Sequence, residues 1–158
     1  MGDKIHHYKI KTVWSGKSIV GNADVKSYDR SHRVLNEGKP SLELTTDNAI
    51  IGDKSKLNPE DLLVSSISSC HMLSYLYICS MSNVIILDYI DNAIGIMEEN
   101  NDGGGKFKSV ELHPTIIVKD KIMIQKAIDL HHEAHKICYI ANSVNFEITI
   151  HPVVTVKN

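Results

Sequence analysis

The chain has few cysteines, and this shortage excludes one class of protein. Three cysteines in 158 residues are too few for a scaffold held together by disulfides. A chain of this length can bury about 68–70% of its unfolded surface without such staples. We therefore expect one domain over residues 1–158, in which each cysteine is either buried and inert or used chemically.

Charge of one sign and long apolar runs are also lacking. The 17 basic and 19 acidic residues give a net charge of −2, and only two of the basic residues are arginines, Arg30 and Arg33. Without a basic stripe, nucleic acid is not an expected partner. No apolar run reaches transmembrane length, and Met1–Trp14 has no signal-peptide core. We expect a cytoplasmic protein with reduced thiols and no membrane partner.

The first third of the chain has the pattern of short strands. Segments rich in β-branched and aromatic residues alternate with turn residues, which predicts an antiparallel meander. The expected strands cover residues 5–14, 20–28, 32–35 and 41–46.

A long helix is predicted to begin after Asn58. Asn58 is a good N-cap, Pro59 suits the first helical position, and Glu60 and Asp61 favour the positive end of the helix dipole. No glycine or proline follows as far as Met81, and apolar residues lie nearly all round the helix. Such a helix is typical of the centre of a fold or of a subunit interface.

The second half of the chain mixes strands with one more helix. Residues 84–98 and 106–119 have strand patterns, and the glycine-rich segment 100–105 between them predicts a hairpin. Helical spacing returns over residues 121–136, and residues 145–156 alternate as a final strand. The predicted fold class is α+β.

Cys70 lies about ten residues into the long helix, after four serines in the five preceding positions. Small side chains let another backbone or a substrate approach the sulfur, although a packing role fits the spacing equally well. His71 is a poor base for Cys70, because adjacent helical residues point about 100° apart. Cys79 is nine residues away and half a turn out of phase, so it cannot pair with Cys70.

Cys138 lies on the apolar stripe of the second helix, which is expected to dock onto the core. The long helix is the obvious element for this stripe to contact, so Cys138 could reach Cys70. The same region has a metal alternative. His131, His135 and Cys138 stand at positions i, i+4 and i+7, a spacing that zinc can use with a further ligand from elsewhere.

Two regions carry recognisable motifs. The first reads NPEDLL at residues 58–63 and SCHML at 69–73, and the second reads AHKICYIANSV at 134–144. Together with the order of strands and helices, they resemble the OsmC/Ohr family of osmotically inducible and organic hydroperoxide resistance proteins. The histidine and methionine after the first cysteine resemble the OsmC side of the family more closely.

The resemblance implies an OsmC-like fold, with antiparallel strands around a long buried central helix, in an intertwined homodimer with active sites at the subunit interface. It implies that Cys70 attacks a peroxide and Cys138 resolves the product, assisted by Glu60 and an arginine. Arg30 is the favoured arginine and Arg33 is the alternative.

The implied substrates are organic hydroperoxides and, to differing degrees, hydrogen peroxide, with an external dithiol as reductant and no cofactor or metal. The alternative function is a non-catalytic ligand-binding module with a hydrophobic pocket at the dimer interface.

Overall fold

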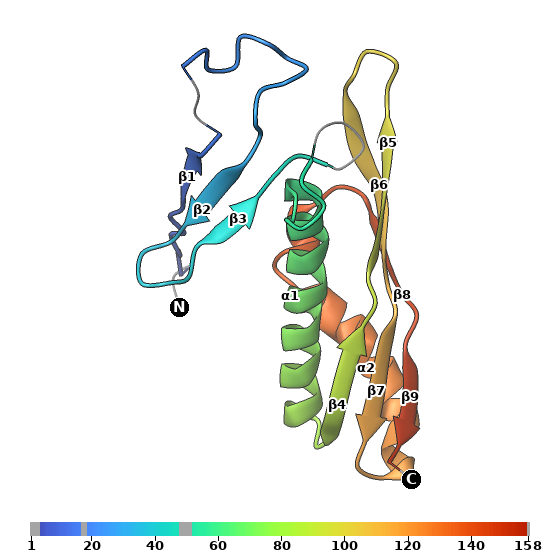
Figure 1. The fold of residues 1–158 in the computed structure, drawn as a ribbon. Coiled ribbons are helices and arrows are strands. Elements are labelled where there is room, and N and C mark those ends of the chain that lie inside the picture. The colour runs from blue at the N-terminus through green and yellow to red at the C-terminus, as the bar shows by residue number, and fades with distance from the viewer. Residues whose placement is uncertain (1–3, 17–18, 48–51, 158) are drawn as a thin grey trace. The chain divides into compact units, whose positions relative to one another are not determined.

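This computed structural model describes residues 4–16, 19–47 and 52–157. The chain divides into two compact units, residues 1–62 and 63–158. The first unit holds strands β1 (Lys11–Trp14), β2 (His32–Leu35) and β3 (Leu42–Leu44), which form one antiparallel sheet in that order (Figure 1). The expected meander is therefore present, with shorter outer strands than the sequence suggested.

The strand expected over residues 20–28 is wrong, because this segment forms turns instead. Asp24 explains the difference. Its carboxylate accepts hydrogen bonds from the Lys26 N–H (2.9 Å) and the Ser27 hydroxyl (2.6 Å). Such local bonds offer the backbone an alternative to a sheet ladder.

The long helix α1 spans Pro59–Met81, as its sequence signals predict. Asn58 Oδ1 accepts from the Asp61 N–H (2.7 Å), and Asp61 Oδ2 accepts from the Asn58 N–H (3.1 Å). This reciprocal pair is a capping box, which satisfies two backbone donors that the helix itself leaves unpaired.

The second unit contains two three-stranded sheets and the helix α2 (Ile124–Ile137). The β4–β7 and β5–β6 pairs are antiparallel, whereas β8 pairs with β6 and β9 pairs with β7 in parallel. The strand bounds are β4 (Ile86–Asp91), β5 (Ile94–Glu99), β6 (Gly105–Leu112), β7 (Pro114–Val118), β8 (Glu147–Ile150) and β9 (Val153–Val156). Short 3-10 turns at Lys121–Met123 and Ala141–Ser143 flank α2.

Each long strand expected in the second half is interrupted. Proline begins or precedes two of the new strands, at His113-Pro114 and His151-Pro152, where it cannot donate to a continuing ladder. The predicted hairpin at residues 100–105 is confirmed between β5 and β6. Gly103 has a φ of +84°, a conformation that glycine adopts without strain.

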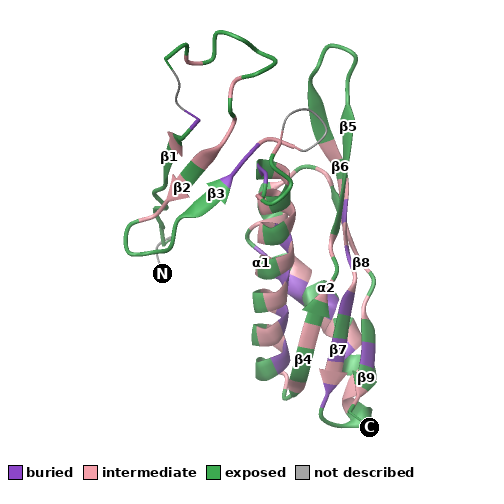
Figure 2. Cartoon of the chain, in the orientation of Figure 1, coloured by how far each residue is buried: buried purple, intermediate pink, exposed green. Residues whose placement is uncertain are grey.

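Within one chain, α1 is buried along one stripe. The buried residues Ile67, His71, Tyr75 and Cys79 recur every four positions and pack into the core with β-strands and α2. Figure 2 shows this buried side of α1 facing the strands and α2 of the second unit. The predicted α+β class with a long central helix is confirmed, but among the described residues only one stripe of the helix is fully buried.

The uncovered part of α1 is apolar. Leu73 and Tyr77 are 61% and 59% exposed. By length and mean hydropathy, α1 is even long enough and apolar enough to cross a membrane, contrary to the expectation from the sequence. Core helices of soluble proteins meet the same criteria, and one stripe of α1 is buried within the second unit.

Candidate active site

Cys70 lies in the middle of α1 and is half-buried. It shares a face of the helix with the exposed residues Leu73 and Tyr77, which follow at positions i+3 and i+7. The Cys70 sulfur therefore lies at the border between the buried stripe of α1 and its uncovered apolar side.

Cys138 is the residue that follows the last turn of α2, and it is fully buried. The expected stripe of α2 is present, since Ala127, His131 and Ala134 are all buried. The helix nevertheless ends at Ile137, and Cys138 adopts an extended conformation with a ψ of 108°. The direction of its side chain therefore follows from this extended conformation and not from the helical spacing of α2.

The structure brings the Cys138 thiol within hydrogen-bonding distance of Cys70. Burial raises the pKa of Cys138 above its ordinary value, and the hydrogen bond to Cys70 and the charge of an ionised Cys70 raise it further. Backbone N–H groups of Ala141 and Ile140 act in the opposite direction. Cys138 thus keeps its proton while it lies against the sulfur of Cys70.

Cys79 takes no part in this contact. It is fully buried in the core beside Tyr75 and Val84, on the far side of α1 as its phase predicts. Burial raises the pKa of its thiol, which disfavours the reactive thiolate. Cys79 is a packing residue.

Beside the cysteine pair, His71 of α1 and His131 of α2 form a buried pair that the sequence motifs do not predict. His71 Nε2 and His131 Nδ1 lie 3.0 Å apart, and the side chain of His71 points into the core. Burial lowers the pKa of His71 to about 4 and that of His131 to about 3, and the neighbouring histidines contribute to both shifts. The signal available in the sequence was the position of each histidine on the apolar stripe of its helix.

The metal alternative finds no support in the described parts of the chain. Among these residues, no three histidine, cysteine, aspartate or glutamate side chains are arranged to share a metal ion. Cys138 lies beyond the end of α2, so the helical spacing on which the metal alternative depended does not extend to it.

Arg30 and Glu60, the other expected site residues, lie together in the first unit. They line one cavity of about 600 Å³. One carboxylate oxygen of Glu60 is buried and has no hydrogen-bond partner among the described residues. The cavity is lined by Thr12, Trp14, Asn22, Tyr28, Arg30, His32, Thr45, Thr46, Pro59 and Glu60.

The two arginines differ in their surroundings. The Arg30 guanidinium lies 4.0 Å above the Tyr28 ring and donates to the carbonyl oxygens of Tyr28 (2.9 Å) and Val25 (2.6 Å). Arg33 is half exposed and forms a long ion pair with Glu43 (3.9 Å). Of the two, Arg30 is the one held at the cavity.

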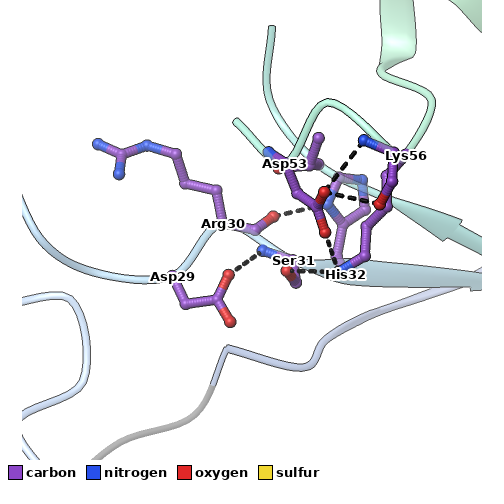
Figure 3. Close-up of polar contacts among 8 residues, drawn as sticks. Asp29, Arg30, Ser31, His32, Asp53 and Lys56 are labelled. Atoms are coloured by element: carbon purple, nitrogen blue, oxygen red, sulfur yellow. Dashed lines mark hydrogen bonds and ion pairs between the residues drawn. The ribbon is translucent and has the colours of Figure 1, made fainter. Parts of the chain in front are cut away.

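Polar contacts stabilise the backbone around Arg30. His32 Nδ1 donates to the Arg30 carbonyl oxygen (3.0 Å), and Lys56 donates to the Ser31 hydroxyl (3.0 Å) while it pairs with Asp53 (3.4 Å). Figure 3 shows the Arg30 side chain extending away from Lys56 and Asp53.

Comparisons with known proteins agree with this fold. The family model for OsmC-like proteins matches residues 52–152. An OsmC-like protein of unknown function from Vibrio cholerae is 27% identical with a TM-score of 0.84, and the match covers 94% of this chain and 100% of that one. No curated protein sequence matches.

Two further solved structures share the fold at lower identity. An organic hydroperoxide resistance protein from Elizabethkingia anophelis, with thiocyanate bound, is 21% identical with a TM-score of 0.68, and the match covers 96% of this chain and 99% of that one. The organic hydroperoxide resistance protein OhrB of Bacillus subtilis is 18% identical with a TM-score of 0.63, and the match covers 94% and 98%.

Proposed function

Since this chain belongs to the OsmC/Ohr family, we propose that it is a thiol peroxidase that reduces organic hydroperoxides with Cys70 and Cys138. The contact between the two thiols is the observation that carries the proposal. Two cysteines 68 positions apart in sequence meet at the border of the core, where one is half-buried and the other is fully buried. This is the arrangement that an attacking and a resolving cysteine require.

The proposed reaction begins with the thiolate of Cys70, because the thiolate is the nucleophilic form. The sulfur bonds to the terminal oxygen of the hydroperoxide, the O–O bond breaks, and the released alkoxide takes a proton and leaves as an alcohol. The peroxide is reduced by two electrons, and Cys70 is oxidised by two electrons to a sulfenic acid.

Cys138 completes the cycle in this proposal. Its sulfur bonds to the Cys70 sulfur, the S–O bond breaks, and the oxygen leaves as water. In sum, two thiols and one hydroperoxide give a disulfide, an alcohol and water. An external dithiol restores both thiols by exchange and is itself oxidised to a disulfide. A cytoplasmic location, where dithiol reductants are available, belongs to the proposal.

Arg30 is the proposed partner of the peroxide and of the anionic sulfur, with Glu60 beside it in the same cavity. A guanidinium stabilises negative charge that develops as the O–O bond breaks. We expect Arg30→Met to lower kcat/KM for a hydroperoxide by about 10²-fold. Arg33→Met is the matched control and is expected to change kcat/KM by less than about twofold, because Arg33 is half exposed and does not line the cavity. Equal losses in the two variants would contradict the role of Arg30.

A second copy of the chain is the proposed partner of the uncovered side of α1. Leu73 and Tyr77 lie on the same face as Cys70, and apolar side chains exposed to this degree at consecutive turns favour an interface. A homodimer that covers this side would also exclude water from the neighbourhood of Cys70.

The test is peroxide-dependent oxidation of dithiothreitol by the purified protein, with cumene hydroperoxide and hydrogen peroxide compared. We expect Cys70→Ser to abolish turnover, and Cys138→Ser to hold Cys70 as a sulfenic acid that a dimedone probe detects by mass spectrometry. Cys79→Ser is the matched control and is expected to turn over normally, because Cys79 packs in the core. Full turnover by the Cys70→Ser protein would refute the proposal.

The cavity of the first unit favours one other function, a non-catalytic ligand-binding module. Trp14 and Tyr28 give it an aromatic lining beside Arg30, which suits an apolar ligand with a negatively charged group. Under this function, a brief pulse of cumene hydroperoxide would leave the mass of Cys70 unchanged, so the same experiment separates the two functions.

A further inference from the structure

The buried histidine pair joins the two helices that hold the cysteines. His71 is 1% exposed and His131 is 3% exposed, and the planes of their rings lie 14° apart. Tyr75 stacks on the His131 ring with 3.9 Å between centroids and donates through its hydroxyl to the Ala127 carbonyl oxygen (3.1 Å). Two buried hydrogen bonds, one from His71 and one from Tyr75, therefore join α1 to α2 in the core.

Burial of this histidine pair in the core lowers the stability of the folded protein. His71 Nδ1 and His131 Nε2 are buried and have no hydrogen-bond partner among the described residues. A buried polar group without a partner lowers stability, because it loses its hydrogen bonds to water and gains none in return. Two apolar side chains of similar size would avoid this cost, so packing alone does not account for the two histidines.

The location of the pair relative to the cysteines suggests its role. His71 is next to Cys70 in α1, and His131 is seven residues, or about two helical turns, before Cys138. The turn of α1 that contains Cys70 (the Cys70 turn) is also held to the neighbouring strands. Asp91 of β4 accepts hydrogen bonds from the Ser68 hydroxyl of this turn and from the His113 N–H. The histidine bond then fixes α2 against this anchored turn.

We propose that His131 is a positioning residue for the cysteine pair: its hydrogen bond to His71 sets α2 against the Cys70 turn of α1 and so keeps Cys138 within reach of the Cys70 sulfur. This inference rests on the proposed peroxidase function and concerns its second step. The attack of Cys70 on the peroxide does not depend on His131, whereas formation of the Cys70–Cys138 disulfide does.

The experiment measures the two steps separately in the full-length protein. One equivalent of cumene hydroperoxide is added, and samples quenched over time are analysed by mass spectrometry for sulfenic Cys70 and for the disulfide. His131→Phe retains a ring against Tyr75 but removes the bond to His71. We expect Cys70 to be oxidised at the wild-type rate and disulfide formation to slow by roughly 10- to 100-fold, the effect of a small misplacement of a reacting group. Sulfenic Cys70 then accumulates, and a second equivalent of peroxide would oxidise it further to the sulfinic acid.

Two further variants separate the hydrogen bond from packing. His131→Asn retains a polar atom near the position of Nδ1, whereas His131→Leu has nearly the same shape as asparagine without hydrogen-bonding groups. Disulfide formation is expected to be at least about tenfold faster in the asparagine variant. His132→Phe is the matched control, because His132 is exposed on the same helix and is expected to keep the wild-type rate.

The outcomes distinguish the positioning role of His131 from the peroxidase function. If folded His131→Phe protein forms the disulfide at the wild-type rate, the positioning role is refuted while the peroxidase function stands. Should the phenylalanine variant fail to fold, equal rates in the asparagine and leucine variants refute the positioning role instead. If wild-type protein shows no oxidation of Cys70 at all, the proposed function fails.

Discussion

Acid is expected to destabilise this protein well above the pH at which its carboxylates titrate, because of His71 and His131. Their pKa values in the folded protein are about 4 and about 3, against 6.5 for an ordinary histidine. The folded state thus resists protonation that the unfolded state accepts. The resulting stability is fully present above pH 6.5 and is lost as the pH falls toward 4.

The size of the loss follows from the lowered pKa values. From pH 7.5 to 4.5 each histidine contributes about 2.5 kcal/mol, because its unfolded form takes up a proton below pH 6.5 at a limiting slope of about 1.4 kcal/mol for each pH unit. One proton can be shared across the 3.0 Å bond between the rings, which reduces the total for the pair. We therefore expect the free energy of unfolding to fall by about 3 kcal/mol for the pair. This is a large part of the roughly 5–15 kcal/mol that is typical of a domain.

Urea unfolding followed by circular dichroism at pH 7.5, 6.5, 5.5 and 4.5 measures this change. The window lies at or above the ordinary pKa of exposed carboxyls such as Asp24 and Glu133, and hydrogen bonds lower the pKa of both groups further. His131→Phe is expected to lose about half of the pH dependence, whereas His132→Asn, at an exposed position, retains all of it. A wild-type free energy of unfolding that stays constant within about 0.5 kcal/mol from pH 7.5 to 4.5 would refute the reasoning.

Three further predictions concern single contacts. Asn58→Ala removes the capping box of α1 and is expected to cost about 1 kcal/mol in urea unfolding, whereas Asn58→Asp retains most of the stability; equal losses would contradict the cap. Gly95→Ala would put a Cβ 2.6 Å from Val64 and 2.7 Å from Phe107 and is expected to cost about 1–3 kcal/mol, a prediction that an unchanged urea midpoint would contradict. Leu73→Glu is expected to convert the proposed dimer into a monomer in sedimentation, and a dimer of wild-type affinity would exclude Leu73 from the interface.

Local signals predicted several elements well. The start of α1 follows from Asn58 and its reciprocal bonds with Asp61, which lie three residues apart. The hairpin between β5 and β6 follows from its glycine-rich turn, in which Gly103 takes a positive φ. The exclusion of Cys79 from the pair follows from helical phase alone. In each case the decisive interaction joins residues close together in sequence.

Other features could not be predicted from the sequence, because their cause does not lie in the local pattern of residues. Residues 20–28 have the composition of a strand, but hydrogen bonds to the Asp24 carboxylate stabilise a turn there. The parallel pairing of β8 with β6 and of β9 with β7 joins segments about 40 residues apart. Hydrophobic alternation predicts a strand, but it does not predict which strand pairs with it or whether the pairing is parallel.

The sequence by itself determined the α+β class, the long helix with Cys70 on it, and the family resemblance carried by the motifs around Cys70 and Cys138. Only the tertiary structure decided that these two thiols touch, and that a buried bond between His71 and His131 joins the helices beside them. The physical reason is that helical periodicity tells which side of a helix is buried but not which residue of another helix it meets. That choice depends on how α1 and α2 pack, and packing is a property of the whole core.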